Sequence, residues 1–209
     1  MRDASDLSPR AARTRSQLVA AGFELLARKP IDAIPIDEVV AKAGVGKGSF
    51  FNHFADKPAF AAALATEVRL ELEGEIGRAN AGVSNPLERI AGGMAVGAAF
   101  ALSNPERAAV LLRSAARVTD RDNPLNAGVR ADFEAACGAG LLRAEARESG
   151  VLYWLGLCQV LMASLVERGA DRGDARNRVR EMTVLGLTGL GADAATAGRI
   201  ADASAARIG

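Results

Sequence analysis

Side chains able to bind phosphate and base edges gather in one short stretch of the chain, GVGKGSFFNHFADK, residues 44–57. The stretch contains the only histidine, His53, together with three of the seven phenylalanines and three glycines. If residues 47–54 are helical, Phe50 and Phe54 lie on one face, because residues four apart share a helix face. The other side then offers short polar groups and the free N–H groups of the first turn, which favour phosphate.

A phosphate-binding loop of the Walker type is the first alternative for this stretch. That loop requires glycine, four residues and then Gly-Lys-Ser/Thr, and it follows a strand. Here the residue five before Gly46 is alanine, and a glycine rather than a hydroxyl residue follows Lys47. A helix rather than a strand is expected before the stretch. We therefore reject this interpretation.

Catalytic and metal-binding residue sets are not evident in the sequence. The chain has one histidine, no paired Cys/His set with zinc spacing and no G-x-S-x-G sequence. The two cysteines, Cys137 and Cys158, are too few for a disulfide framework and are expected to be reduced and buried. We expect no enzyme activity, no metal site and no cofactor.

The elements that position these residues are expected to be helices throughout. Strict alternation of apolar and polar residues is absent, and β-branched residues are sparse beside alanine, leucine and arginine. The most apolar run, residues 151–166, is shorter than the roughly 20 residues of a membrane span, so it is expected to be a buried helix. The pattern predicts an all-α chain with helices over residues 11–28, 36–43, 47–54, 57–79, 87–102, 106–118, 125–148, 151–168, 174–190 and 193–207.

The composition and the linkers indicate a two-domain organisation. The chain has 209 residues, of which 49% are apolar and 24% charged, and a net charge of +1, so no global field indicates a nucleic-acid or membrane partner. The segment NAGVSNP, residues 80–86, has the composition of a linker. We expect a helix-turn-helix domain over 10–57, a connecting helix and linker over 58–82, and a helical domain over 83–209.

Residues 13–64 resemble the TetR-type transcriptional repressors. The signature of that family contains the pattern I-A-x-x-A-G-V-S-K-G-T-L-Y-x-H-F-x-x-K, and residues 39–57 read VVAKAGVGKGSFFNHFADK at the same spacing. The matching positions are Val39, Ala43, Gly44, Val45, Lys47, Gly48, Phe50, Phe51, His53, Phe54 and Lys57. The resemblance implies an all-α fold with an N-terminal three-helix helix-turn-helix domain and a C-terminal helical ligand-binding and dimerisation domain.

The resemblance also implies which residues bind DNA. The candidates are Lys47, Gly48, Ser49, Phe51, Asn52, His53 and Lys57. The two lysines and the histidine are expected to contact phosphates, and the serine and asparagine to read bases. The aromatic ring could stack on a sugar, touch a thymine methyl group, or belong to the core.

Three departures from the family pattern remove hydroxyl groups that commonly contact phosphate. Pro35 stands near the start of the second helix, where the family usually has a small hydroxyl residue, and is expected at its first position. Gly46 replaces the usual serine and is expected to cap the third helix. Phe51 replaces the usual tyrosine. Weakened DNA binding is therefore an open alternative.

The C-terminal domain is expected to hold a ligand pocket and a dimer interface. Apolar candidates for the pocket are Met94, Phe100, Phe133, Cys137, Tyr153, Trp154 and Met162, each of which could instead be ordinary core. The family usually dimerises through its last two long helices, here 151–168 and 174–190. Their apolar stripes give the interface candidates Leu152, Leu155, Gln159, Met162, Val179, Met182, Leu185, Gly186 and Leu190.

The expected function is that of a cytoplasmic, homodimeric transcriptional repressor. It would bind a palindromic DNA operator and leave it when a small, apolar effector binds, with no membrane partner. Two alternatives stay open, namely a DNA-binding dimer without a small-molecule inducer and a helical interaction protein with a degenerate DNA-binding domain.

Overall fold

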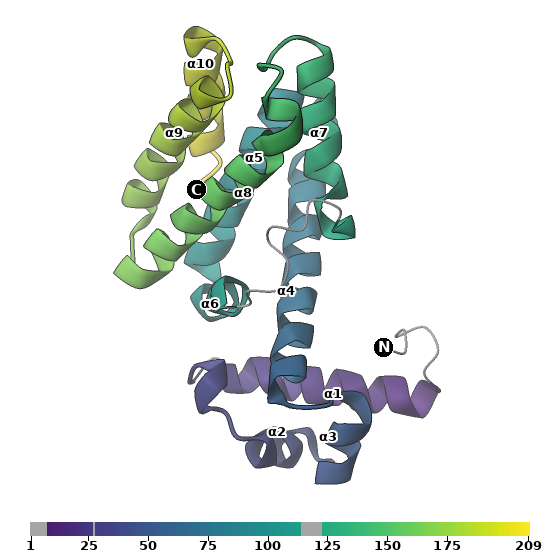
Figure 1. Ribbon diagram of the computed structural model, residues 1–209. Coiled ribbons are helices and arrows are strands. Elements are labelled where there is room, and N and C mark those ends of the chain that lie inside the picture. The colour runs from purple at the N-terminus through teal and green to yellow at the C-terminus, as the bar shows by residue number, and fades with distance from the viewer. Residues whose placement is uncertain (1–7, 27, 114–122) are drawn as a thin grey trace. The chain divides into compact units, whose positions relative to one another are not determined.

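A computed structural model describes residues 8–26, 28–113 and 123–209, and every secondary-structure element in these ranges is a helix. The all-α fold expected from the sequence is confirmed (Figure 1). The longer helices are α1 (Pro9–Leu26), α2 (Ile36–Ala43), α3 (Lys47–His53), α4 (Lys57–Ala79), α5 (Pro86–Ser103), α6 (Pro105–Arg113), α7 (Ala127–Gly138), α8 (Ala146–Arg168), α9 (Arg172–Gly189) and α10 (Ala194–Ala205). Two short 3₁₀ turns, η2 (Ile31–Ala33) and η3 (Pro124–Asn126), complete the elements.

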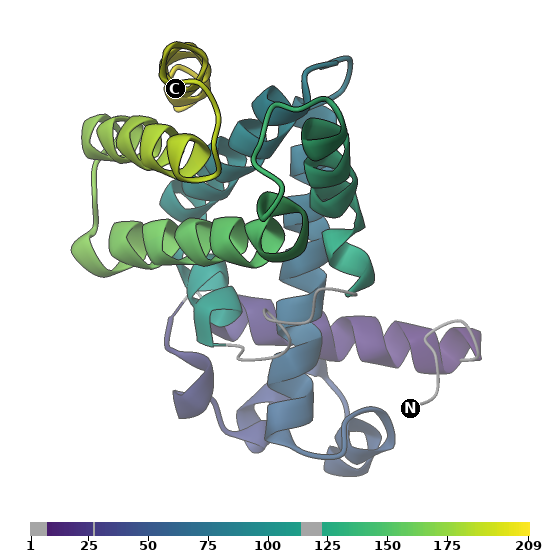
Figure 2. The same ribbon diagram turned by 45° about the horizontal axis from the view of Figure 1, so that its top comes forward.

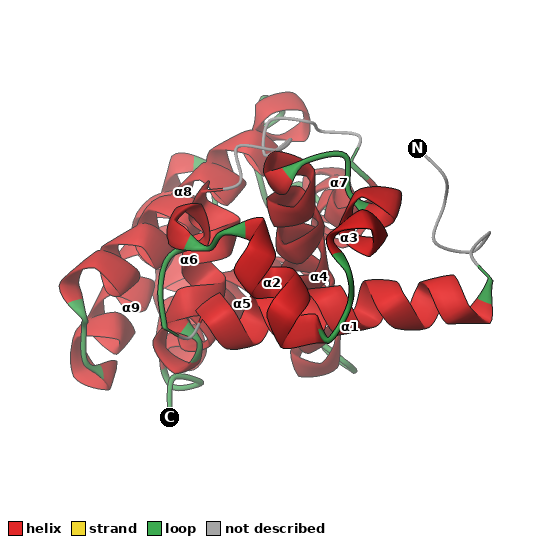
Figure 3. Ribbon diagram, turned by 90° about the horizontal axis from the view of Figure 1, so that it is seen from below, coloured by secondary structure: helices red, strands yellow, loops and turns green. Residues whose placement is uncertain are grey.

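The chain divides into two compact units within α4, the first ending at Val68 and the second beginning at Arg69. In the first unit, α1 packs against both α2 and α3, as the view from below shows (Figure 3). Gly22 of α1 permits a close approach to α4, because a Cβ atom there would lie 2.7 Å from Cζ of Phe60. The buried side chains of Leu18, Phe60 and Leu64 fill the centre of this unit.

Helix α5 is the central element of the second unit. It packs against α6, α7, α8, α9 and α10 (Figure 2), and its alanines and glycines let these neighbours approach. Met94 and Phe100 of α5 are buried, as are Phe133 of α7 and Trp154 of α8. A Cβ atom at Gly186 of α9 would lie 2.6 Å from the Trp154 ring, so this glycine allows α9 to pack closely on α8.

The prediction of one helix over residues 125–148 is wrong. The prediction that the next helix begins only after Gly150 is also wrong. Helix α7 ends at Gly138, and Gly140 follows with φ of 68°, a left-handed conformation that favours glycine. Helix α8 already begins at Ala146 and continues through Gly150. That glycine is retained inside the helix because the Phe133 ring packs where its Cβ would be, at 2.6 Å.

By length and composition alone, the 23-residue α8 would be able to cross a membrane. It is longer than the apolar run 151–166 that the sequence suggested. The helix packs on α5, α6, α7 and α9 within its unit, yet only 33% of its most apolar 18-residue window is buried. Helix α8 therefore has a core side and an exposed apolar side.

Candidate nucleic-acid interface

Helices α2 and α3 form a helix-turn-helix with a tight connection. Gly44 ends α2 with φ of 67°, the left-handed conformation expected of a glycine after a helix. Its N–H donates to the carbonyl of Ala41 at 3.2 Å, and the N–H of Val45 donates to the carbonyl of Val40 at 3.0 Å. Gly46 then caps α3 in an extended conformation, as expected from the sequence. The turn therefore fixes the direction in which α3 leaves α2.

Helix α3 has only seven residues, so its own hydrogen bonds cannot keep it folded. Aromatic contacts hold it in place instead. The ring centroid of Phe60 on α4 lies 5.3 Å from that of Phe50 and 5.0 Å from that of Phe54, both in edge-on arrangements. Phe60 thus links α4 to both aromatic rings of the α3 segment.

The residues expected to bind DNA lie on the outer part of this motif. Lys47, Gly48, Phe51 and Asn52 are exposed, whereas Ser49, His53 and Lys57 are half-buried. Phe51 is 48% exposed, so it does not belong to the core. A Cβ atom at Gly48 would have no neighbour within 4 Å, so a foreign surface can approach the backbone there.

Both lysines of the candidate interface interact with acceptors inside the first unit. Nζ of Lys47 lies 2.7 Å from Oδ1 of Asp37, the second residue of α2. Nζ of Lys57 donates to the backbone carbonyl of Asp32 at 2.5 Å. The sequence analysis did not predict this ion pair, because it depends on how α2 and α3 meet in space. An exposed ion pair of this kind contributes at most about 1 kcal/mol, so a phosphate can replace Asp37.

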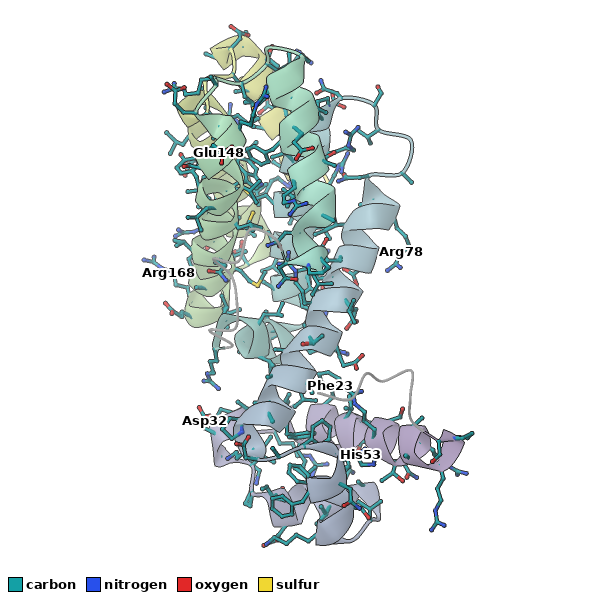
Figure 4. All side chains as sticks on the ribbon, turned by 45° about the vertical axis from the view of Figure 1, so that its right-hand side comes forward. Phe23, Asp32, His53, Arg78, Glu148 and Arg168 are labelled. Carbon is teal, nitrogen blue, oxygen red and sulfur yellow. The ribbon has the colours of Figure 1, made fainter. Side chains whose placement is uncertain are left out.

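His53 carries little charge at neutral pH. Partial burial, and then the positive charge of Arg15, lower the pKa of His53 below its ordinary value of 6.5. Figure 4 shows the histidine in the first unit. Arg15 itself lies 5.7 Å above the Phe54 ring and donates to Oε1 of Glu67 at 3.2 Å. His53 can therefore offer a phosphate a neutral N–H donor and little positive charge.

The three sequence departures have different structural consequences. Pro35 caps α2 rather than occupying its first position, so the expectation of a first-turn proline is wrong by one residue. Neither Pro35 nor Gly46 provides a side-chain cap. The first N–H groups of α2 and α3 therefore receive no side-chain hydrogen bond from these residues. The backbone amides at both helix starts remain suited to phosphate oxygens.

Comparisons with known proteins agree with this geometry. Residues 18–64 match the family described as bacterial regulatory proteins, tetR family. This segment of the chain, which contains α2 and α3, is therefore similar to the tetR family of regulators. A search of curated proteins gave no match.

Solved structures share the fold over most of this chain. RolR in complex with the ligand resorcinol matches with a TM-score of 0.75 and 19% identity, over 92% of this chain and 94% of that one. FadR from Bacillus subtilis in complex with stearoyl-CoA matches with a TM-score of 0.65 and 12% identity, over 83% and 98%. An ArpA-like gamma-butyrolactone receptor matches with a TM-score of 0.56 and 22% identity, over 95% and 98%.

Of the seven side chains expected to line a ligand pocket, one lines the pocket found among the described residues. An open pocket of about 690 Å³ in the second unit is lined by Phe100, with Glu75, Arg78 and Arg207 around it. The other six candidates do not line it. Met94, Phe133, Trp154 and Met162 are buried core, Tyr153 is exposed, and Cys137 is half-buried.

The expected interface residues of the regulator fall into two groups. Met162, Val179, Gly186 and Leu190 are buried inside the chain, where they pack on its own helices and present little surface to a partner. Leu152 and Leu185 are exposed, and Leu155, Gln159 and Met182 are half-buried. The exposed apolar residues Tyr153 and Val160, which the sequence analysis did not place at an interface, adjoin the second group on α8.

Phe50→Ala is expected to destabilise the first unit by about 3–5 kcal/mol, because it removes the ring that anchors α3 and leaves a cavity. Phe51→Ala is a matched control, since the Phe51 ring is 48% exposed and makes one edge-on contact with Phe50, so its loss should cost about 1 kcal/mol. Urea unfolding followed by circular dichroism measures both effects. Equal losses in the two variants would contradict the anchoring role of Phe50.

Proposed function

We propose that the regulator is a cytoplasmic homodimer that represses transcription from a palindromic operator and is released by a small, mainly apolar ligand. The observation that carries the proposal is the helix-turn-helix of the first unit. Its short α3 is anchored on one side by Phe50 and Phe54 and open on the other. A helix with that exposure is suited to enter a major groove.

We assign the contacts to DNA by the chemistry and exposure of each side chain. Lys47 and Lys57 would contact phosphates as cations, and His53 would do so as a neutral donor. Ser49 and Asn52 would read base edges through hydrogen bonds. The exposed Phe51 ring would contact a sugar or a thymine methyl group, and Gly48 would let the backbone come close.

Selection of duplexes from a random DNA pool tests the function, and variants test the contacts. A palindromic site is expected, because a two-fold dimer presents two equivalent helices. Lys47→Ala should weaken binding to all duplexes and lower the salt slope by about 1 per helix. His53→Ala should weaken binding at pH 7.5 without changing that slope, because the imidazole is neutral there.

Asn52→Ala and Ser49→Ala should instead change which bases the regulator prefers, with a loss of about 1–3 kcal/mol at the affected position. The measurement is fluorescence anisotropy with the selected duplex and with single-base variants of it. An equal loss on selected and scrambled duplexes would contradict a base-reading role. The absence of any selected sequence would contradict the proposed function.

Exposed apolar side chains on α8 and α9 support dimerisation through these helices. Leu152, Tyr153 and Val160 of α8 and Leu185 of α9 are exposed, and Leu185 is 67% exposed. A patch of this kind on a soluble protein indicates an interaction surface. In the proposed homodimer, the interface residues are the exposed and half-buried candidates of α8 and α9. The four buried candidates, Met162, Val179, Gly186 and Leu190, stay in the core of each chain.

The double variant Met182→Glu/Leu185→Glu is expected to be monomeric, since two unpaired carboxylates are costly at an apolar interface. Light scattering should then give the 21.6 kDa mass of one chain rather than twice that mass. Leu70→Glu, at an exposed leucine of α4, is the control and should leave the dimer intact. A double variant that is still dimeric would contradict the proposed interface.

The proposed ligand site lies in the second unit. RolR and FadR, which share the fold, were solved with resorcinol and stearoyl-CoA. The pocket beside Phe100 has about 690 Å³, within the range of small-molecule sites. Helix α4 is continuous from Lys57 to Ala79, so it belongs to both units. A ligand that displaces its second half could misplace recognition helices, which must stand about 34–36 Å apart.

Release by a ligand implies reciprocal coupling. If a small molecule lowers the affinity for DNA by some factor, DNA must lower the affinity for that molecule by the same factor. Native mass spectrometry can identify a molecule bound to the purified regulator, and calorimetry can measure its affinity with and without the selected duplex. Equal affinities in the two titrations would favour a DNA-binding dimer without a small-molecule inducer.

A further inference from the structure

Lysine is confined to one part of the chain. All four lysines lie between residues 29 and 57, in the first unit, and arginine supplies every other basic side chain. Each of the four has an acceptor there. Lys29 pairs with Glu38, Lys42 with Glu24 at 2.6 Å, Lys47 with Asp37 at 2.7 Å, and Lys57 with the carbonyl of Asp32 at 2.5 Å. Three lysines of this unit are therefore paired with a carboxylate of the unit, and the fourth with a carbonyl.

The pair between Lys47 and Asp37 differs from the others in its position and exposure. It joins the first residue of α3 to the first turn of α2, which are the two helix starts of the motif. Its side chains are 57% and 72% exposed, more than those of the pairs that Lys29 and Lys42 make. The carboxylate thus lies at the surface that would face DNA.

We propose that Asp37 is an internal competitor of the DNA backbone, which occupies Lys47 in the free protein and weakens sequence-independent binding. The inference rests on the proposed function, because it concerns the same interface. A carboxylate offers Lys47 the same negative charge and the same type of acceptor oxygen as a phosphate. A phosphate can therefore contact Lys47 only if the ion pair between Lys47 and Asp37 breaks or weakens.

Proximity makes the competition effective even if the ammonium group contacts both acceptors. A phosphate oxygen would lie about 2.8 Å from the ammonium nitrogen, which itself lies 2.7 Å from Asp37. Phosphate and carboxylate are then at most about 6 Å apart, less than the Debye length of about 8 Å at physiological salt. Their repulsion is therefore only partly screened.

The competition lowers the contribution of phosphate contacts to the free energy of DNA binding relative to that of base contacts. It penalises the phosphate contact whatever the sequence, and it leaves the hydrogen bonds of Ser49 and Asn52 to bases unaffected. Base contacts then account for a larger share of the remaining affinity. The displaced carboxylate would also attract a cation from solution, which offsets part of the counterion release when Lys47 meets DNA.

A purely structural role for Asp37 predicts that Asp37→Asn does not raise the affinity for DNA. A carboxylate in the first turn of α2 interacts favourably with the helix dipole. If that were its only role, Asp37→Asn would loosen the motif and lower the affinity for DNA or leave it unchanged. The competitor role predicts tighter binding from a variant that is no more stable.

The test measures binding of the full-length dimer to a fluorescent 30-base-pair duplex of random sequence, from 25 to 300 mM NaCl. Asp37→Asn should bind about three- to tenfold more tightly at 150 mM NaCl, with a salt slope steeper by about 1 per recognition helix. Asp202→Asn is the matched control, since it makes the same charge change in the exposed pair that Arg180 and Asp202 form at 2.6 Å in the second unit. It should change the affinity less than twofold.

Lys47→Ala shows whether Asp37 acts through this lysine. In a Lys47→Ala background, the gain from Asp37→Asn should fall by at least half. An equal gain with and without Lys47 would overturn the proposal, as would an unchanged affinity of Asp37→Asn or the same gain from Asp202→Asn. If the wild type binds no duplex even at 25 mM NaCl, the proposed DNA-binding function fails, and the inference fails with it.

Discussion

The packing of the Phe50 and Phe54 rings against Phe60 is the constraint on which the interface depends. Helix α3 is too short to be stable in isolation, so its position is determined by what its buried face contacts. Phe50 is fully buried against Phe60 of α4, and Gly22 leaves the room that Phe60 needs. Because these contacts hold one side of α3 rigidly, the other side can be polar, rich in glycine and open without loss of the fold.

The open side of α3 offers few uncompensated positive charges to DNA. His53 is largely neutral at neutral pH, and the lysines of the first unit all have acceptors within it. Positions 35, 46 and 51 carry no hydroxyl group that could contact a phosphate. Such a surface would attract DNA weakly before it docks, and its specificity would then depend on hydrogen bonds from few side chains, Ser49 and Asn52 foremost.

Much of the first unit could be predicted from the sequence, because its signals are local. The glycine after α2, the cap at Gly46 and the spacing of Phe50 and Phe54 each follow from a few neighbouring residues, and the bounds of α2 and α4 were predicted correctly. The break after Gly138 and the start of α8 at Ala146 were missed, because Gly150 resembles a helix terminator in the sequence. Only the Phe133 ring, 17 residues away along the chain, explains why a glycine stands inside that helix. The ion pair of Asp37 with Lys47 was missed for a similar reason, since it depends on how two helices meet.

Helix α8 shows why an apolar stripe alone does not separate a core from an interface. Its buried side includes Trp154, which packs on Gly186 and thereby fixes α9 against α8. Its exposed side carries Leu152, Tyr153 and Val160, which remain 51%, 42% and 64% exposed in a single chain. The first set makes the helix pair rigid, and the second set can be buried only by another surface. A rigid pair with an apolar outer side is what a two-fold interface requires, because each copy must present the same shape to the other.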